Sequence, residues 1–211
     1  MADIDKLLQG YRDFYKKHFE VDNSLYKDLS TLGQDPKTLV ISCSDSRSDP
    51  TIITSAAAGD IFAVRNVANL VPPYQPDSET LHGVSAALEF AVRYLSIENI
   101  IILGHSNCAG IKALVDEETS ENRSTFIHSW VRIAKKAREI ALKEGGDTYH
   151  ICEKEGIHVS LDNLMTFPWI EKRVEAGTLK LYGWYFSIND GSLSQYNAES
   201  GNFEAITTSA P

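Results

Sequence analysis

Two short segments of the chain combine cysteine, histidine and charged side chains within a few residues of one another. The first holds Cys43, Asp45 and Arg47, and the second holds His105 and Cys108. Thiolate sulfur and imidazole nitrogen are suitable zinc ligands, and three protein ligands leave a fourth position open. Both segments are therefore candidates for one catalytic zinc site. The alternative is that the cysteines are small core residues and the histidine is only hydrogen-bonded.

The charged residues of the first segment favour the catalytic interpretation. Asp45 and Arg47 are two positions apart, so in an extended or turning backbone their side chains can point the same way. An arginine lowers the pKa of a neighbouring carboxyl and fixes its orientation. Such a carboxylate can accept a hydrogen bond from water bound to zinc. A solvated surface turn is the plainer alternative, since serine, aspartate and arginine are common in turns.

The elements around these segments predict an α/β fold with a mostly parallel central β-sheet flanked by helices. Short runs rich in β-branched or aromatic residues alternate with segments of helical periodicity, which is the pattern of parallel sheets. Because ligands bind beyond the carboxyl ends of parallel strands, the two chemical segments should face one crevice. The expected strands are 37–43, 60–64, 99–104 and 179–188, and the expected helices after the first strand are 78–95, 109–116, 121–144 and 153–175.

The first 35 residues predict a helical arm ahead of a single catalytic domain at 36–211. An apolar stripe with several aromatic residues recurs there at helical spacing and must cover either the chain's own core or a neighbouring subunit. We expect it to pack on a partner subunit. The stripe consists of Ile4, Leu7, Leu8, Tyr11, Phe14, Tyr15 and Phe19.

Composition narrows the function classes. The 211 residues carry a formal charge of −9, which argues against nucleic acid or an anionic membrane surface as a partner. No apolar run approaches the roughly 20 residues that span a bilayer, and the first residues do not have the order of a secretory signal. We therefore expect a cytoplasmic protein, in which three cysteines indicate metal binding or a reactive thiol more than a disulfide framework.

A competing motif overlaps the second segment. Gly104, Ser106 and Cys108 nearly match the Gly-x-Ser-x-Gly elbow of serine hydrolases, with cysteine in place of the last glycine. That elbow is strained and needs small residues, so the cysteine weakens the match. The downstream histidines have no telling context; they are His128, His150 and His158.

Beyond these motifs, the chain resembles the β-class carbonic anhydrases from about residue 34 to residue 188. The resemblance implies one zinc ion per subunit on Cys43, His105 and Cys108, with an Asp45–Arg47 pair beside it. It also implies reversible hydration of carbon dioxide to bicarbonate and a proton by zinc-bound hydroxide, and an obligate homodimer that is often doubled to a homotetramer. The matching blocks are 43–47, 59–74, 82–92, 104–112 and 152–170.

Within that family the chain is most similar to the plant-like branch. Gln34 and Phe62 match positions that line the substrate pocket from across the dimer interface, and Val67 matches another apolar lining position. Phe90 stands where the plant-type pocket has a tyrosine, so one hydroxyl is lost. Val40 stands where the other branch has the tryptophan of an inhibitory bicarbonate site, so we expect no such site.

Further features leave alternatives open. Ala109 replaces the usual glycine after the last ligand, which affects pocket width. The proton carrier is unassigned, with His82 a candidate only because histidine titrates near neutrality. Cys152 is interpreted as structural. A carbonyl sulfide or carbon disulfide hydrolase on the same fold is the nearest alternative function, and a non-catalytic zinc protein is the next.

Overall fold

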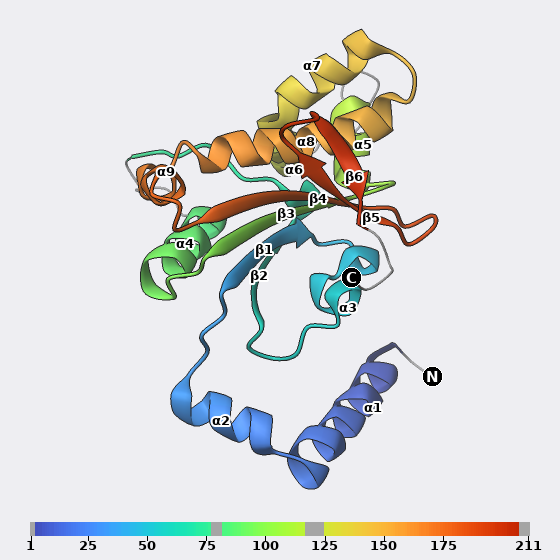
Figure 1. Ribbon diagram of the computed structural model, residues 1–211. Coiled ribbons are helices and arrows are strands. Elements are labelled where there is room, and N and C mark those ends of the chain that lie inside the picture. Colours follow the sequence, from blue (N-terminus) through green and yellow to red (C-terminus); the bar gives the residue numbers. More distant parts are fainter. Residues whose placement is uncertain (1–2, 77–81, 117–124, 207–211) are drawn as a thin grey trace.

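In a computed structural model, the chain is described over residues 3–76, 82–116 and 125–206. The described strands form one six-stranded sheet in the order β2-β1-β3-β4-β5-β6. The first four strands run parallel, and β5 and β6 form an antiparallel hairpin at one edge (Figure 1). The strands are β1 (Thr38–Cys43), β2 (Ile61–Asn66), β3 (Asn99–His105), β4 (Lys180–Phe186), β5 (Leu193–Asn197) and β6 (Asn202–Ala205). The expected mostly parallel sheet is confirmed.

Hydrophobic sequence places β1 and β3 in the middle of the sheet. Every residue of β3 except Asn99 is buried, as expected for a parallel strand covered on both faces. One face of the sheet packs against a core cluster that includes Leu88, Ile157 and Ile170 from three helices. The other face forms a smaller cluster around Val40. The carboxyl ends of β1 and β3 thus lie side by side in the interior.

Helices cover the sheet in layers. The long helix α8 packs across β3 and β4, and α7 packs on α8 from outside. Figure 1 shows α3 on the opposite side of the sheet from α8. No described helix combines the length and the apolar character needed to cross a membrane. The helices of this body are α3 (Pro50–Thr54), α4 (Gly83–Glu89), α5 (Ala109–Val115), α6 (Thr125–Val131), α7 (Lys135–Glu144), α8 (Thr148–Leu164) and α9 (Pro168–Glu175).

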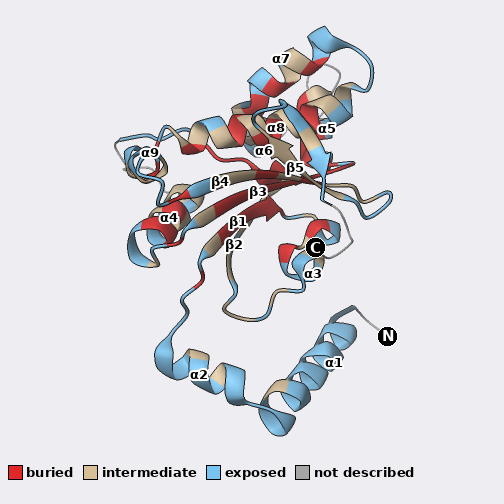
Figure 2. Cartoon of the chain, in the orientation of Figure 1, coloured by how far each residue is buried: buried red, intermediate tan, exposed pale blue. Residues whose placement is uncertain are grey.

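The amino-terminal segment forms two helices, α1 (Asp3–Tyr15) and α2 (Ser24–Leu32), joined by a π-helical turn. They extend away from the sheet, and both are almost entirely exposed (Figure 2). Neither helix contains a buried residue, although α1 carries the expected apolar stripe. The arm is therefore a helical surface that this chain alone does not cover.

Several boundaries differ from the expected ones. The helix expected over 153–175 is two helices: α8 begins at Thr148 and ends at Leu164, and α9 begins at Pro168. Pro168 starts the new helix and disfavours helical backbone before it. The β5–β6 hairpin was not expected at all. The helix expected over 78–95 begins at Gly83 in the described residues and ends in a π-helical turn. Residues 78–81 and 121–124 of the expected helices lie outside the described residues.

A close approach of α8 to β3 gives a stability prediction at Gly104. A Cβ at this position would lie 2.7 Å from Cδ1 of Ile157, a residue with no exposed surface. We expect Gly104→Ala to lower the free energy of unfolding by about 1–3 kcal/mol, measured by urea denaturation. Gly83→Ala is the control, since no atom of the described residues lies within 4 Å of a Cβ built at Gly83. Equal stability of the two variants would contradict the close packing.

Candidate metal centre

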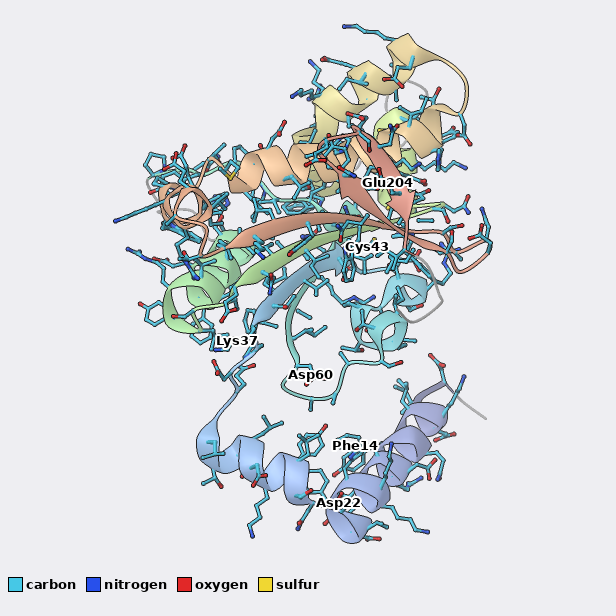
Figure 3. The ribbon with its side chains drawn as sticks, viewed as in Figure 1. Phe14, Asp22, Lys37, Cys43, Asp60 and Glu204 are labelled. Carbon is cyan, nitrogen blue, oxygen red and sulfur yellow. The ribbon has the colours of Figure 1, made fainter. Side chains whose placement is uncertain are left out.

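The two chemical segments meet at the carboxyl edge of the sheet. Cys43 ends β1, His105 ends the neighbouring β3, and Cys108 directly precedes α5. The Sγ atoms of Cys43 and Cys108 are 4.0 Å apart, and the three possible ligand atoms all lie within 4.8 Å of one another. Figure 3 shows Cys43 where the central strands converge. All three side chains are buried, so they form a compact cluster shielded from solvent.

The hydrogen bonds of His105 leave one ring nitrogen aimed at a ligand. Its Nδ1 lies 2.9 Å from the carbonyl oxygen of Ser106, and since a carbonyl only accepts, Nδ1 carries the proton. Nε2 is then an unprotonated acceptor, and it is buried with no hydrogen-bond partner among the described residues. A buried nitrogen with a free lone pair, next to two sulfur atoms, is what a metal ligand requires.

The paired thiols fit a divalent cation for an electrostatic reason. A thiolate on Cys43 accepts a hydrogen bond from the Cys108 thiol, which lowers the pKa of Cys43. The same pairing and burial raise the pKa of Cys108. Two buried thiolates at this separation repel each other unless a positive charge lies between them. The cluster therefore suits zinc better than it suits two neutral core cysteines.

The third cysteine does not join this cluster. Cys152 on α8 is fully buried, and burial raises its pKa to about 12. It belongs to the apolar packing between α8 and neighbouring helices. Its thiol therefore stays protonated at neutral pH, in agreement with the structural role expected for it.

Asp45 and Arg47 form the pair that their spacing indicated. The Arg47 Nη2 donates to Asp45 Oδ2 at 2.7 Å, and Nε donates to Oδ1 at 3.0 Å. The guanidinium holds the pKa of Asp45 well below its usual range, helped by the Arg47 backbone N–H. Arg47 also reaches the carbonyl oxygen of Asn107 at 3.4 Å, which ties the two chemical segments together. The carboxylate thus stays ionised and fixed beside the cluster.

The backbone of the second segment turns sharply between its two candidate ligands. Asn107 adopts a left-handed conformation with φ of 58°, which asparagine tolerates better than most residues. Its side-chain amide donates to Asn189 Oδ1 at 3.1 Å. This turn lets His105 and Cys108 face one point from the end of a strand and the start of a helix.

Arg65, at the end of β2, was missed by the sequence reasoning. Its guanidinium donates to the carbonyl oxygens of Cys43 at 3.0 Å and Asp45 at 2.8 Å, and it forms an ion pair with Asp49. Asp49 in turn caps α3 by accepting from the N–H of Thr51. Arg65 therefore fastens the first chemical segment to the neighbouring strand. Its position near the carboxyl end of a third parallel strand could have indicated in the sequence that Arg65 lies close to the site.

The four residues expected to line the substrate pocket fall into two groups. Val67 packs against the cluster that contains both ligand cysteines. Phe62 pairs with Leu39 at the far end of β1, and its ring lies 5.9 Å from that of Phe90. Gln34 is exposed between α2 and β1. Within one chain, Gln34, Phe62 and Phe90 lie outside the cluster of Cys43, His105 and Cys108. The expected placement of Gln34 and Phe62 across a dimer interface stays a prediction.

The serine-hydrolase alternative receives no support from this geometry. Ser106 is 6% exposed, and its hydroxyl oxygen accepts a hydrogen bond from the backbone N–H of Ile188 at 2.8 Å. A nucleophile elbow instead presents its serine hydroxyl to substrate. Ser106 is therefore a structural residue that joins the second segment to the loop after β4.

Fold and site together define an α/β protein whose parallel sheet can hold a transition metal at its carboxyl edge. The carbonic anhydrase family model matches residues 38–193. The chain is 41% identical over 203 residues to beta carbonic anhydrase 5, chloroplastic, of Arabidopsis thaliana, covering 93% of this chain and 65% of that relative. It is 34% identical over 207 residues to a carbonic anhydrase of Synechocystis sp., covering 96% and 74%. The chain belongs to the β-carbonic anhydrase family, and the Arabidopsis match agrees with its plant-like branch.

Solved structures agree with this assignment. The β-carbonic anhydrase CcaA superposes with a TM-score of 0.90 at 33% identity, covering 99% of this chain and 94% of that one. A tetrameric β-carbonic anhydrase of Sordaria macrospora gives a TM-score of 0.73 at 26% identity, covering 92% and 93%. The chain spans just under two thirds of the length of its chloroplastic relative, at 65%.

Proposed function

We propose that this chain is a zinc-dependent carbonic anhydrase that interconverts carbon dioxide and bicarbonate. The observation that supports this most directly is the buried convergence of Cys43, His105 and Cys108 in a member of the β-carbonic anhydrase family. When bound, zinc supplies a Lewis acid that lowers the pKa of water towards neutrality, an effect for which carbonic anhydrases are the usual example. The three side chains would hold it and leave a fourth position for solvent or substrate.

The chain's own residues then orient the reactants. Asp45 accepts a hydrogen bond from the attacking water and aims its lone pair at carbon dioxide. Arg47 holds both carboxylate oxygens and so would keep Asp45 from ligating the zinc. Arg65 fixes the backbone on which both ligand and carboxylate stand. These contacts hold the reacting groups in place before substrate arrives, and such positioning accelerates the reaction.

The substrate pocket requires a second copy of the chain in this proposal. Gln34, Phe62 and Phe90 would line it from across a dimer interface, with the Gln34 amide bonding bicarbonate and the phenylalanines forming an apolar wall. Residues 1–35 would form the arm that embraces the partner, since Tyr11 is 60% exposed and Ile4 and Leu7 are each 64% exposed. Two homodimers could pair further into a tetramer.

The dimer has a direct test. We expect the full-length protein to sediment as a dimer or a larger even-numbered assembly, and removal of residues 1–35 to weaken that assembly and lower carbon dioxide hydration together. Sedimentation velocity and stopped-flow hydration measure the two effects. A fully active monomer would contradict the shared pocket.

The proposed activity is tested by zinc content and carbon dioxide hydration on one preparation. We expect about one zinc per chain, loss of hydration on chelation, and recovery when zinc is returned. Carbonyl sulfide and carbon disulfide are assayed in parallel, because the same metal site could hydrolyse them. If either sulfur compound is hydrolysed faster than carbon dioxide is hydrated, the hydrolase alternative replaces this proposal.

A further inference from the structure

A buried carboxylate lies directly behind one of the candidate metal ligands. Glu153, on α8, is only 5% exposed. Its Oε1 accepts a hydrogen bond from the backbone N–H of Cys108 at 3.0 Å, and its Oε2 accepts one from the hydroxyl of Tyr185 at 2.8 Å. Burying a carboxylate is costly unless its oxygens are hydrogen-bonded, and here each oxygen accepts one hydrogen bond.

The contact falls at a critical point of the backbone. Cys108 precedes the first residue of α5, where no helical carbonyl lies before it to accept its N–H. A buried N–H without an acceptor is destabilising, and the carboxylate removes that cost. Because Glu153 stands on the rigid α8, it also fixes where the Cys108 backbone lies and hence the direction of its Sγ atom.

Tyr185 and His150 complete the support. Since the Tyr185 hydroxyl donates to Glu153, its oxygen is free to accept from Nδ1 of His150 at 3.0 Å. Burial and the bond to Glu153 raise the pKa of Tyr185, so the hydroxyl remains a donor at neutral pH. These residues line a surface hollow of about 440 Å³ beside Cys108. Hydrogen bonds thus connect His150 at the surface, through Tyr185 and Glu153, to the candidate ligand Cys108. Asp45 and Arg47 take no part in them.

We propose that Glu153 is a positioning residue that sets the geometry and strength of metal binding through the backbone of Cys108, with Tyr185 as its anchor. This inference rests on the zinc site proposed above. Groups that orient metal ligands typically change metal affinity about 10–100-fold when removed. In many metal sites a carboxylate accepts a hydrogen bond from a ligand histidine and orients it. Here the carboxylate of Glu153 accepts the hydrogen bond from the backbone N–H of a ligand cysteine.

Three variants separate positioning from general stability. Glu153→Leu removes the acceptor, and we expect zinc to bind about 10–100-fold more weakly, by competition with a chromophoric chelator. The thiolate-to-cobalt and d–d absorption bands of the cobalt(II) form should shift as well. Glu153→Gln keeps a carbonyl oxygen for the Cys108 N–H and should restore affinity to within about threefold of wild type. Glu155→Gln, two residues along the same helix, is the matched control and should bind as wild type does.

The outcomes are distinct. Should Glu153→Leu not fold, Tyr185→Phe decides, since it removes only the hydroxyl that anchors Oε2 and should weaken zinc binding about threefold or more with altered cobalt bands. Wild-type affinity and an unchanged cobalt spectrum in the folded variants would overturn the role of Glu153. Failure of the wild-type protein to bind either metal would instead overturn the proposed zinc site.

Discussion

Replacing Cys108 with serine is expected to remove the bound zinc and lower carbon dioxide hydration by at least about 100-fold. Serine is nearly isosteric, so the fold should survive, but its neutral hydroxyl is a poor zinc ligand compared with a thiolate. The change also leaves Cys43 without the sulfur atom 4.0 Å away with which it shares the cluster. Zinc content by atomic emission and stopped-flow hydration measure the two losses.

Cys152→Ser is the matched control for this variant. Cys152 is as buried as Cys108, but its sulfur atom is not part of the group of three possible ligand atoms. We expect it to retain zinc and hydration and to lose only some stability, because a hydroxyl then replaces a buried thiol without an evident partner. A Cys108→Ser protein with a full complement of zinc and wild-type turnover would show that the three-ligand site is wrong.

Much of the fold could be predicted because hydrophobic pattern alone determined it. The run of isoleucines in β3 has no polar face, so it had to be buried on both sides of a parallel sheet. The β5–β6 hairpin escaped prediction because its residues are half-buried in β5 and mostly exposed in β6, and they carry no strong apolar alternation. The break before α9 was visible in Pro168, but helical periodicity on either side outweighed it in the prediction.

The site divides in the same way. Cysteine, histidine and a spaced Asp–Arg pair are recognisable because their chemistry is unusual at strand ends. Arg65 and Glu153 are ordinary charged residues in sequence, and only the folded chain shows that their partners are backbone atoms of Cys43 and Cys108. Side-chain contacts to a distant backbone have no sequence pattern of their own. Supporting residues of this kind are therefore found from structure.

Arg47→Ala should lower kcat/KM for carbon dioxide hydration by about 10–100-fold while zinc stays bound. The change deletes all three side-chain hydrogen bonds to Asp45 and the contact with the Asn107 carbonyl, but it removes no candidate metal ligand. Asp45 is then free to rotate, either away from the attacking water or onto the fourth metal position. Both movements reduce the fraction of protein in the reactive geometry.

The pKa of Asp45 separates this cause from simple protonation. The Arg47 side chain lowers that pKa, so its removal lets the pKa of Asp45 rise towards the ordinary range of aspartate, while the backbone N–H at position 47 still lowers it. A carboxyl with such a pKa is still ionised at neutral pH. The loss of activity should therefore persist across neutral and alkaline pH, where protonation of Asp45 plays no part.

Two further variants test whether the effect is specific to the Arg47–Asp45 contact. Arg47→Lys keeps the positive charge but loses the bidentate contact with Asp45. We therefore expect its activity to lie between those of Arg47→Ala and the wild type. Lys136→Ala removes a different exposed ion pair, with Asp162, and should leave hydration unchanged. Unchanged turnover in Arg47→Ala would mean that Asp45 is held by its backbone turn alone. Loss of zinc from that variant would place Arg47 among the groups that hold the metal site together, because an unrestrained Asp45 would then disturb the ligands themselves.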